Sequence, residues 1–265
     1  MKVEEIMNKN VITIDKDQKL SYALELMQKH NISRLVVTQN SIPIGIITLK
    51  DIANRLDPSK VTTIQITSLH VSSCMSSELY TISIGNSVKK AANLMIEKSV
   101  SGLPVLNARG ELVGIITKTD LTKLCIDFND VYVKDVMSDR GLVVIHPTER
   151  IIKARLDILE NNISGAPVVS NNKVVGVLTE GMIAKAMQEF SLRIPDKYKG
   201  ARIRNVLVKD VMRRNPPTVA PEDTISHAAR VILDNNLNTI PVINNEKLVG
   251  IITKTDLTRL IANMS

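Results

Sequence analysis

"LVGIITKTDLT" occurs twice in the chain, letter for letter, at residues 112–122 and 248–258. Two other stretches align with it on a glycine, "IPIGIITLKDI" at 42–52 and "KVVGVLTEGMI" at 173–183. A tetrapeptide that ends in methionine precedes each stretch, and the four methionines are Met7, Met75, Met137 and Met212. Because both anchors recur in the same order, the sequence contains four copies of one repeat.

Each copy predicts the same order of elements. A short run of β-branched residues, such as "NVITI" at 10–14, predicts a strand. A helix follows, because apolar residues recur at i, i+3, i+4 and i+7 in three copies: Leu20, Ala23, Leu24 and Met27; Val88, Ala91, Ala92 and Met95; and Ile225, Ala228, Ala229 and Ile232. The third copy departs from this pattern, with Arg155 where Leu24 aligns. Two strands joined by a turn and a second short helix complete a β-α-β-β-α unit.

The copies are expected at 1–56, 70–125, 132–187 and 207–265, with a basic linker at 188–206. The helices of such a unit cover one face of a small sheet, and its other apolar face needs a neighbour. An even number of copies favours two back-to-back pairs, 1–125 and 132–265. The predicted fold class is therefore α+β, built from four repeats in two modules.

Composition narrows the class of protein. With 44% hydrophobic residues the chain can bury a core, and no apolar run reaches the roughly 20 residues that span a bilayer. The first ten residues, "MKVEEIMNKN", lack the apolar core of a signal peptide. Two cysteines, Cys74 and Cys125, form no disulfide framework, which fits a reducing cytoplasm. The net charge of +7 favours an anionic partner: a nucleotide, a nucleic acid or an acidic protein.

A T-x-x-D pattern opens the second helix of three copies, at Thr48/Asp51, Thr117/Asp120 and Thr253/Asp256. Its structural interpretation is a capping box, in which the threonine and the acid satisfy free N–H groups at the helix start. Its functional interpretation is a nucleoside-phosphate site. The start of a helix favours phosphate, and an ionised carboxylate accepts hydrogen bonds from the paired hydroxyls of a ribose. Both interpretations are compatible with one threonine.

The repeat resembles the CBS domain. The resemblance is carried by the methionine-ended tetrapeptide, the apolar helix that ends in Met27 or Met95, the "LPV", "APV" or "IPV" strand of copies two to four, and "GIITxTDL". The last is exact in copies two and four and varied in copies one and three. In that family two repeats pair into a Bateman module, and two modules commonly stack as a flat disc. The whole chain is similar to stand-alone four-CBS proteins of the archaeal kind and, in layout, to the γ subunit of AMP-activated kinase. The resemblance implies that the aspartate holds a ribose, the threonine a phosphate, and that adenine lies between apolar strands.

The resemblance also implies composite pockets, with walls from both copies of a pair. The Asp51 pocket draws on Arg34, Thr48, Lys50, Leu79, Tyr80, Val100 and Ser101. The Asp120 pocket draws on Thr117, Thr119, Val11, Ile12, Ile32 and Ser33. The Asp256 pocket draws on Thr253, Thr255, Leu142, Val143, Ile163 and Ser164. Arg34 aligns with a phosphate-binding arginine of the kinase subunit and with Gly102, Gly165 and Thr239 here, so the Asp51 pocket is expected to hold phosphate best.

The third copy serves as an internal comparison. It keeps Thr179, but Met182 replaces the aspartate and cannot accept ribose hydroxyls. The facing wall comes from the fourth copy, where Pro216 and Pro217 align with Val11 and Ile12 and offer no N–H. Three competent pockets and one degenerate pocket are therefore expected.

The predicted function is a non-enzymatic sensor that binds AMP, ADP or ATP, or another adenosyl ligand such as S-adenosylmethionine, and acts on a partner protein or on a second copy of the chain. No metal-ligand spacing or catalytic constellation is indicated among the four histidines and the acids. One rival function is nucleic-acid binding through the basic strip at 197–214, against which stands an aromatic content of 2%, too low for base stacking. Another is a scaffold whose pockets are relics.

Overall fold

The structure is a computed structural model of the chain, and it describes residues 1–55, 69–193 and 205–264. The first copy comprises α1 (Val3–Ile6), β1 (Thr13–Asp15), α2 (Leu20–Lys29), β2 (Arg34–Gln39), β3 (Ile42–Thr48) and α3 (Leu49–Arg55). The second comprises η1 (Val71–Ser73), β4 (Ile82–Ser83), α4 (Val88–Glu97), β5 (Gly102–Leu106), β6 (Leu112–Thr117), α5 (Lys118–Leu124) and η2 (Cys125–Asp127).

The third copy comprises η3 (Val133–Asp135), α6 (Ile151–Glu160), β7 (Gly165–Ser170), β8 (Lys173–Thr179) and α7 (Glu180–Arg193). The fourth comprises α9 (Val208–Val211), β9 (Arg213–Arg214), α10 (Ile225–Asp234), β10 (Thr239–Asn244), β11 (Lys247–Thr253) and α11 (Lys254–Asn263). Each copy thus has the predicted helix, antiparallel hairpin and second helix, in that order.

The opening strand of the unit differs between copies. In the first two copies it pairs in parallel with the hairpin, β1 on β2 and β4 on β5. In copies three and four it is a single bridge, from Ile145 to Val168 and from Val219 to Val242. Each of these bridge residues is followed two positions later by a proline, at Pro147 and Pro221. Proline has no N–H for a ladder, so the short opening strand that the sequence predicts is reduced to one parallel bridge in these two copies.

The hairpins are closed by residues suited to tight turns. Asn40 and Ser41 both have positive φ between β2 and β3, and so do Asn171 and Asn172 between β7 and β8. Two such residues in succession form the hairpin turn whose twist matches the flanking strands, and asparagine tolerates that backbone conformation better than most residues. The turn places the glycine strand of each copy beside the strand that starts the hairpin.

The two sequence anchors contact each other across each pair of copies. The segment that leads into one copy crosses to its partner, where Asn8 bridges Ile115. A Cβ on Gly114 would lie 2.5 Å from the sulfur of Met7, and one on Gly176 would lie 2.5 Å from the sulfur of Met212. The glycine is therefore needed because the methionine of the partner copy packs directly on its Cα. The same contact joins Met75 to Gly45 and Met137 to Gly250.

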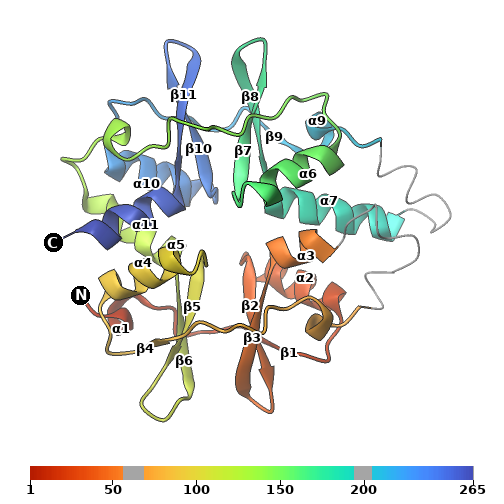
Figure 1. Cartoon of the computed structure of the whole chain (residues 1–265), viewed down its shortest axis with the longest axis vertical. Coiled ribbons are helices and arrows are strands. Elements are labelled where there is room, and N and C mark those ends of the chain that lie inside the picture. Colours follow the sequence, from red (N-terminus) through yellow and green to blue (C-terminus); the bar gives the residue numbers. More distant parts are fainter. Residues whose placement is uncertain (56–68, 194–204, 265) are drawn as a thin grey trace.

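The four copies surround a common centre, with copies one and two in the lower half of Figure 1 and copies three and four in the upper half. The modules meet through α3 on α7 and through α11 on α4 and α5. Two apolar cores cross this boundary, one mainly of copies two and four and one mainly of copies one and three. This arrangement confirms the predicted fold of four repeats in two paired modules.

Arg155 has a role that the repeat pattern did not predict. Its side chain is only 3% exposed, and it reaches from α6 to the last turn of α3 in the other module. There Nε donates to the carbonyl oxygen of Ala53 at 2.7 Å, and the guanidinium also donates to that of Asn54 at 2.8 Å. The last carbonyls of a helix have no partner within the helix, so Arg155 satisfies two of them.

Candidate functional site

The three T-x-x-D motifs form the same hydrogen bonds. In each, one carboxylate oxygen of the aspartate accepts from the backbone N–H and from the hydroxyl of its threonine. The N–H and hydroxyl distances are 2.8 and 2.6 Å for Asp51, 3.0 and 2.7 Å for Asp120, and 2.9 and 2.6 Å for Asp256. The predicted capping geometry is therefore present at the start of α3, α5 and α11.

The direction of these bonds limits what the threonine can do. A hydroxyl has one hydrogen, and Thr253 directs it to Asp256 while its oxygen accepts from the N–H groups of Thr255 and Asp256 at 3.2 Å. In this geometry the threonine orients the carboxylate and has no hydrogen left for a phosphate. A phosphate at the start of α11 would therefore need donors other than this hydroxyl.

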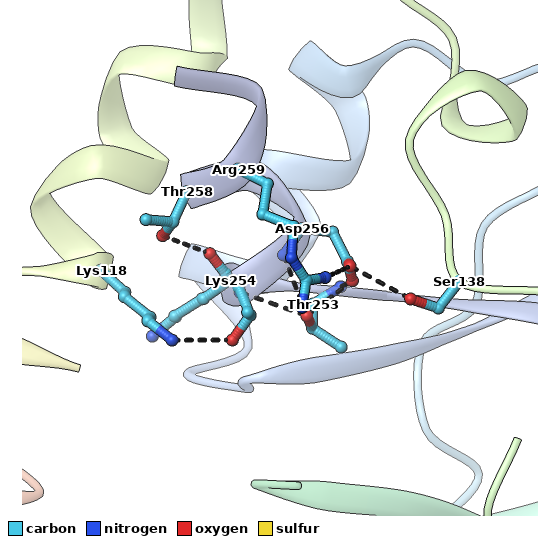
Figure 2. Close-up of polar contacts among 8 residues, drawn as sticks. Lys118, Ser138, Thr253, Lys254, Asp256, Thr258 and Arg259 are labelled. Atoms are coloured by element: carbon cyan, nitrogen blue, oxygen red, sulfur yellow. Dashed lines mark hydrogen bonds and ion pairs between the residues drawn. The ribbon is translucent and has the colours of Figure 1, made fainter. Parts of the chain in front are cut away.

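The second oxygen of each aspartate differs between the sites. In Figure 2 the second oxygen of Asp256 accepts from Ser138 at 3.1 Å and from Arg259 at 3.0 Å. That of Asp120 accepts from Lys123 at 3.1 Å. Within the described ranges, the second oxygen of Asp51 has no hydrogen-bond partner. Asp51 therefore retains the most capacity to accept from a new hydroxyl.

Ser138 was not predicted from the sequence. It follows the methionine anchor of copy three and bridges Ile251 on β11 of copy four, so the leading segment of one copy touches the aspartate of its partner. Ser76 follows the anchor of copy two in the same way and bridges Ile46. Its position in the sequence could have indicated this role, because Asn8, Ser76 and Ser138 each follow an anchor methionine directly.

Arg34 and Ser101, expected in one pocket, are brought together across the first module. The guanidinium of Arg34 donates to the hydroxyl oxygen of Ser101 at 2.8 Å, while its Nε is buried and has no partner within the described residues. Burial lowers the pKa of Arg34 to about 10, and the charges of Asp120 and Glu180 oppose that shift. Arg34 thus lies between the first and second copies with unused hydrogen-bonding capacity.

Several of the predicted wall residues are partly buried apolar side chains that pack on the two cores. Tyr80 and Val100 pack on the core of copy two, and Ile12 and Ile32 pack on that of copy one. Val143 and Ile163 pack on the core shared by copies one and three. The carbonyl oxygen of Ser33 accepts from the N–H of Leu49, and that of Ser164 accepts from the N–H of Glu180. Val11, Leu79 and Leu142 are partly buried.

A family model for the CBS domain matches the chain four times, at residues 3–57, 71–127, 133–189 and 208–263. The chain belongs to the CBS-domain family. It is 25% identical to protein MJ1225 of Methanocaldococcus jannaschii over 270 residues, which covers 96% of each chain. The crystal structure of MJ1225 superposes with a TM-score of 0.87 at 23% identity and covers 99% of this chain and 100% of that one.

A second similar structure is an uncharacterised conserved protein from Pyrococcus horikoshii. It has a TM-score of 0.67 at 21% identity and covers 98% of this chain and 100% of that one. At these identities the likeness concerns the fold alone. The four-repeat CBS arrangement is therefore shared along almost the whole length of both structures.

The site of the third CBS repeat is built differently. Thr179 is buried, and its hydroxyl oxygen accepts from the N–H of Met182 at 3.3 Å. The position of Ser138 is taken by Arg213, whose guanidinium donates to the carbonyl oxygen and the side-chain oxygen of Asn235, at 2.9 and 2.7 Å. Pro216, on the predicted facing wall, is buried and Pro217 is partly buried. This site thus lacks both the carboxylate and the hydroxyl that meet in the fourth repeat.

Charged side chains gather where the second helices of the CBS repeats approach one another. Lys118 donates to the hydroxyl oxygen of Thr255, and Lys254 donates to that of Thr119, both at 2.9 Å. Burial lowers the pKa of both lysines to about 8. Burial also raises the pKa of Glu180 to about 7, against the charge of Lys50, whose Nζ lies 3.9 Å away. Lys50 also donates to the side-chain oxygen of Asn162.

Thr239, at the position of Arg34 in the fourth CBS repeat, is fully buried. Its hydroxyl lacks a hydrogen-bond partner among the residues that the structure describes. The register pairs Thr239 with Thr253, as it pairs Arg34 with Thr48, Gly102 with Thr117 and Gly165 with Thr179. The structure therefore places this position beside the capping threonine in all four repeats.

The basic strip at 197–214 lies partly outside the described residues. Four of its basic residues fall there: Lys197, Lys199, Arg202 and Arg204. Of the remainder, Arg213 is bonded to Asn235, and Arg214 donates to the carbonyl oxygen of Lys209 at 3.3 Å. Over 1–55, 69–193 and 205–264, no three His, Cys, Asp or Glu side chains are grouped to hold a metal ion. The same ranges contain no helix with the length and apolar character that crossing a bilayer requires.

Proposed function

We propose that this CBS protein is a regulatory protein that binds adenine nucleotides, AMP, ADP or ATP, between the paired repeats of each module. The observation that carries the proposal is the aspartate at the start of the second helix, held by its own threonine in three repeats. In the Asp256 site the carboxylate is also touched by Ser138 of the paired repeat. A ligand at that carboxylate would therefore contact both repeats.

The chemistry of the site supports a nucleoside monophosphate or its higher phosphates. The carboxylates of Asp51, Asp120 and Asp256 suit ribose hydroxyls, because an ionised carboxylate only accepts hydrogen bonds. Apolar side chains of the paired repeat suit the adenine ring, and the cations around the second helices suit phosphate. An adenosyl ligand without phosphate, such as S-adenosylmethionine, would use the first two features and not the third.

The proposal includes no chemical step. Ligand would act by binding one arrangement of the two modules better than another, and so shift the population towards that arrangement. The change would pass to a partner protein or to a second copy of the chain. A cytoplasmic location, predicted from the two cysteines, belongs to the same proposal; both are free thiols in the structure.

Isothermal calorimetry with AMP and with 2′,3′-dideoxy-AMP tests the proposal. The two ligands share adenine and phosphate and differ only in the ribose hydroxyls. We expect AMP to bind and the dideoxy analogue to bind about 10- to 100-fold more weakly, because the charge-assisted bonds to the aspartates are lost. Equal affinities would contradict the ribose role. Absence of binding by AMP, ADP, ATP and S-adenosylmethionine would favour a scaffold with relic pockets.

Nucleic-acid binding is separated from nucleotide binding by its response to salt. Contacts to many phosphates of one strand release counterions, so the affinity falls steeply as the salt concentration rises. Filter binding of single- and double-stranded DNA at two salt concentrations would show that fall if the basic strip at 197–214 were the functional surface. We expect no specific retention of either nucleic acid.

A further inference from the structure

Two lysines cross the boundary between the CBS modules in opposite directions. Lys118 is the first residue of α5 in the second repeat, and its ammonium donates to the hydroxyl oxygen of Thr255 in the fourth. Lys254 is the first residue of α11 in the fourth repeat, and its ammonium donates to that of Thr119 in the second. Figure 2 shows Lys118 reaching towards the start of α11 beside Lys254.

Neither ammonium has a carboxylate partner within 4.0 Å among the described residues, although Lys254 is only 8% exposed. The charged groups that face Lys118 are Arg259, Arg34, Asp256 and Glu180, and those that face Lys254 are Arg34, Asp120 and Lys123. Other cations therefore lower the pKa of each lysine in addition to burial. Cations held away from water without a paired anion are unfavourable. Lys254 is buried and Lys118 partly buried, so the arrangement is complementary to an anion.

Each lysine also interacts electrostatically with the helix-start aspartate of the opposite repeat. The charge of Asp256 of the fourth repeat favours the charged form of Lys118 of the second, as does that of Glu180 of the third. Asp120 of the second repeat has the same effect on Lys254 of the fourth. Thr255 stands between Thr253 and Asp256 in the T-x-x-D motif, so the Lys118 ammonium lies at the candidate site of the other module.

The equivalent positions in the other two repeats do not share this excess of positive charge. There the first residues of the second helices are Leu49 and Glu180. Glu180 lies 3.9 Å from the ammonium of Lys50, so a cation and a carboxylate already face each other at that end of the boundary. Within the described ranges, the half of the boundary formed by repeats two and four instead presents two lysines that have no paired carboxylate, of which Lys254 is buried and Lys118 is partly buried.

We infer that Lys118 binds the phosphate of the nucleotide in the Asp256 site, and that Lys254 binds that of the nucleotide in the Asp120 site. The inference rests on the proposed function and names the residues that would hold its phosphate end. Each site would then comprise an aspartate and apolar walls from one module and a phosphate ligand from the other. Nucleotide binding would strengthen the contact between modules, because its phosphate would neutralise a cation of the opposite module.

The assignment of each lysine to the site of the opposite module is tested in variants that keep only one of the three candidate ribose-binding aspartates. Asp51→Ala with Asp120→Ala leaves only the Asp256 site, and Asp51→Ala with Asp256→Ala leaves only the Asp120 site. We expect Lys118→Met to weaken AMP about 10-fold or more in the first background and less than about 3-fold in the second. Lys254→Met should give the opposite pattern. Methionine keeps most of the side-chain length and removes a charge that has no paired carboxylate, so the fold should tolerate it.

Equal losses in both backgrounds, or a larger loss at the site of the lysine's own repeat, would overturn the inference. Such results would leave the proposed function intact, because AMP would still bind. If wild-type AMP binding itself is absent, the proposed function fails first. Each lysine variant is measured in both backgrounds. A general effect of methionine on folding would weaken AMP binding equally in the two, so their comparison is the control.

If the single-site variants bind AMP too weakly to measure, proton uptake by the wild-type chain tests whether Lys118 and Lys254 bind the phosphate. Burial lowers the pKa of each lysine to about 8, so part of each is neutral near that pH, and a bound phosphate would raise the pKa. Binding of AMP should therefore take up protons, seen as a binding enthalpy that depends on the ionisation enthalpy of the buffer. Lys118→Met and Lys254→Met should each reduce that uptake. Uptake unchanged by both substitutions would contradict the inference.

Discussion

Asp256→Ala is expected to lower the affinity of the Asp256 site for AMP by about 10- to 100-fold while the chain stays folded. A charge-assisted hydrogen bond to a ribose hydroxyl contributes roughly 1.5–3 kcal/mol to binding. The substitution also removes the cap of α11, which costs about 1 kcal/mol of stability. A domain pair with a continuous apolar core should tolerate that loss. Calorimetry in the Asp51→Ala, Asp120→Ala background reports on this site alone.

Asp210→Ala is the matched control for this prediction. Its carboxylate accepts from the N–H of Leu207 at 3.2 Å, also three residues earlier, at the start of α9. The Asp210→Ala variant therefore loses a helix cap and leaves the residues of the candidate sites unchanged. AMP affinity should be unchanged in Asp210→Ala. If Asp256→Ala binds AMP as tightly as its parent, the carboxylate is only a cap, and the ribose assignment is wrong.

Arg155→Leu is expected to lower the free energy of unfolding by roughly 2–5 kcal/mol. The substitution restores the apolar pattern of the first repeat, so the repeat pattern alone would predict a more stable chain. The structure predicts the reverse, because the carbonyls of Ala53 and Asn54 would lose charge-assisted partners inside the protein. Urea denaturation followed by circular dichroism would measure the change, with the midpoint falling at a similar slope.

Arg150→Met provides the comparison for Arg155→Leu. Arg150 is exposed and precedes the same helix, α6, so its replacement should change the free energy of unfolding by less than about 0.5 kcal/mol. Equal stability of Arg155→Leu and the wild type would show that the contact between α6 and α3 does not contribute to folding. A more stable Arg155→Leu would show that packing at this position outweighs the two hydrogen bonds.

The repeat itself could be predicted from the sequence because its signals are local. The anchors, the spacing of Leu20, Ala23 and Met27, and the T-x-x-D pattern report on contacts within one repeat or within a pair. The order of elements follows from them. The weakened opening strand of repeats three and four was also within reach, since Pro147 and Pro221 are visible in the sequence.

Contacts between modules could not be predicted in this way. Arg155 breaks the apolar period of its helix, and only the placement of α3 in the other module shows what it binds. Lys118 and Lys254 read as ordinary first-turn residues until the two helices face each other. Which repeats are neighbours across the centre depends on packing of whole modules, and periodicity within a repeat contains no information about it.

The Met182 site distinguishes the ribose interpretation from a purely structural one. Met182 removes the carboxylate, and Pro216 with Pro217 removes backbone donors from the predicted facing wall. Losing two polar contacts of about 1–1.5 kcal/mol each would weaken a nucleotide by some 30- to 150-fold. The hydroxyl of Thr179 remains at the start of α7, so inorganic phosphate without a nucleoside is compatible with this site.

A crystal structure at saturating AMP tests most directly whether the helix-start aspartate is the ribose acceptor. The account predicts a ribose within hydrogen-bonding distance of Asp51, Asp120 and Asp256, and none beside Met182. Titration of the same protein should then give at most three nucleotides per chain. A ribose beside Met182, or nucleotides whose riboses avoid the three aspartates, would contradict it.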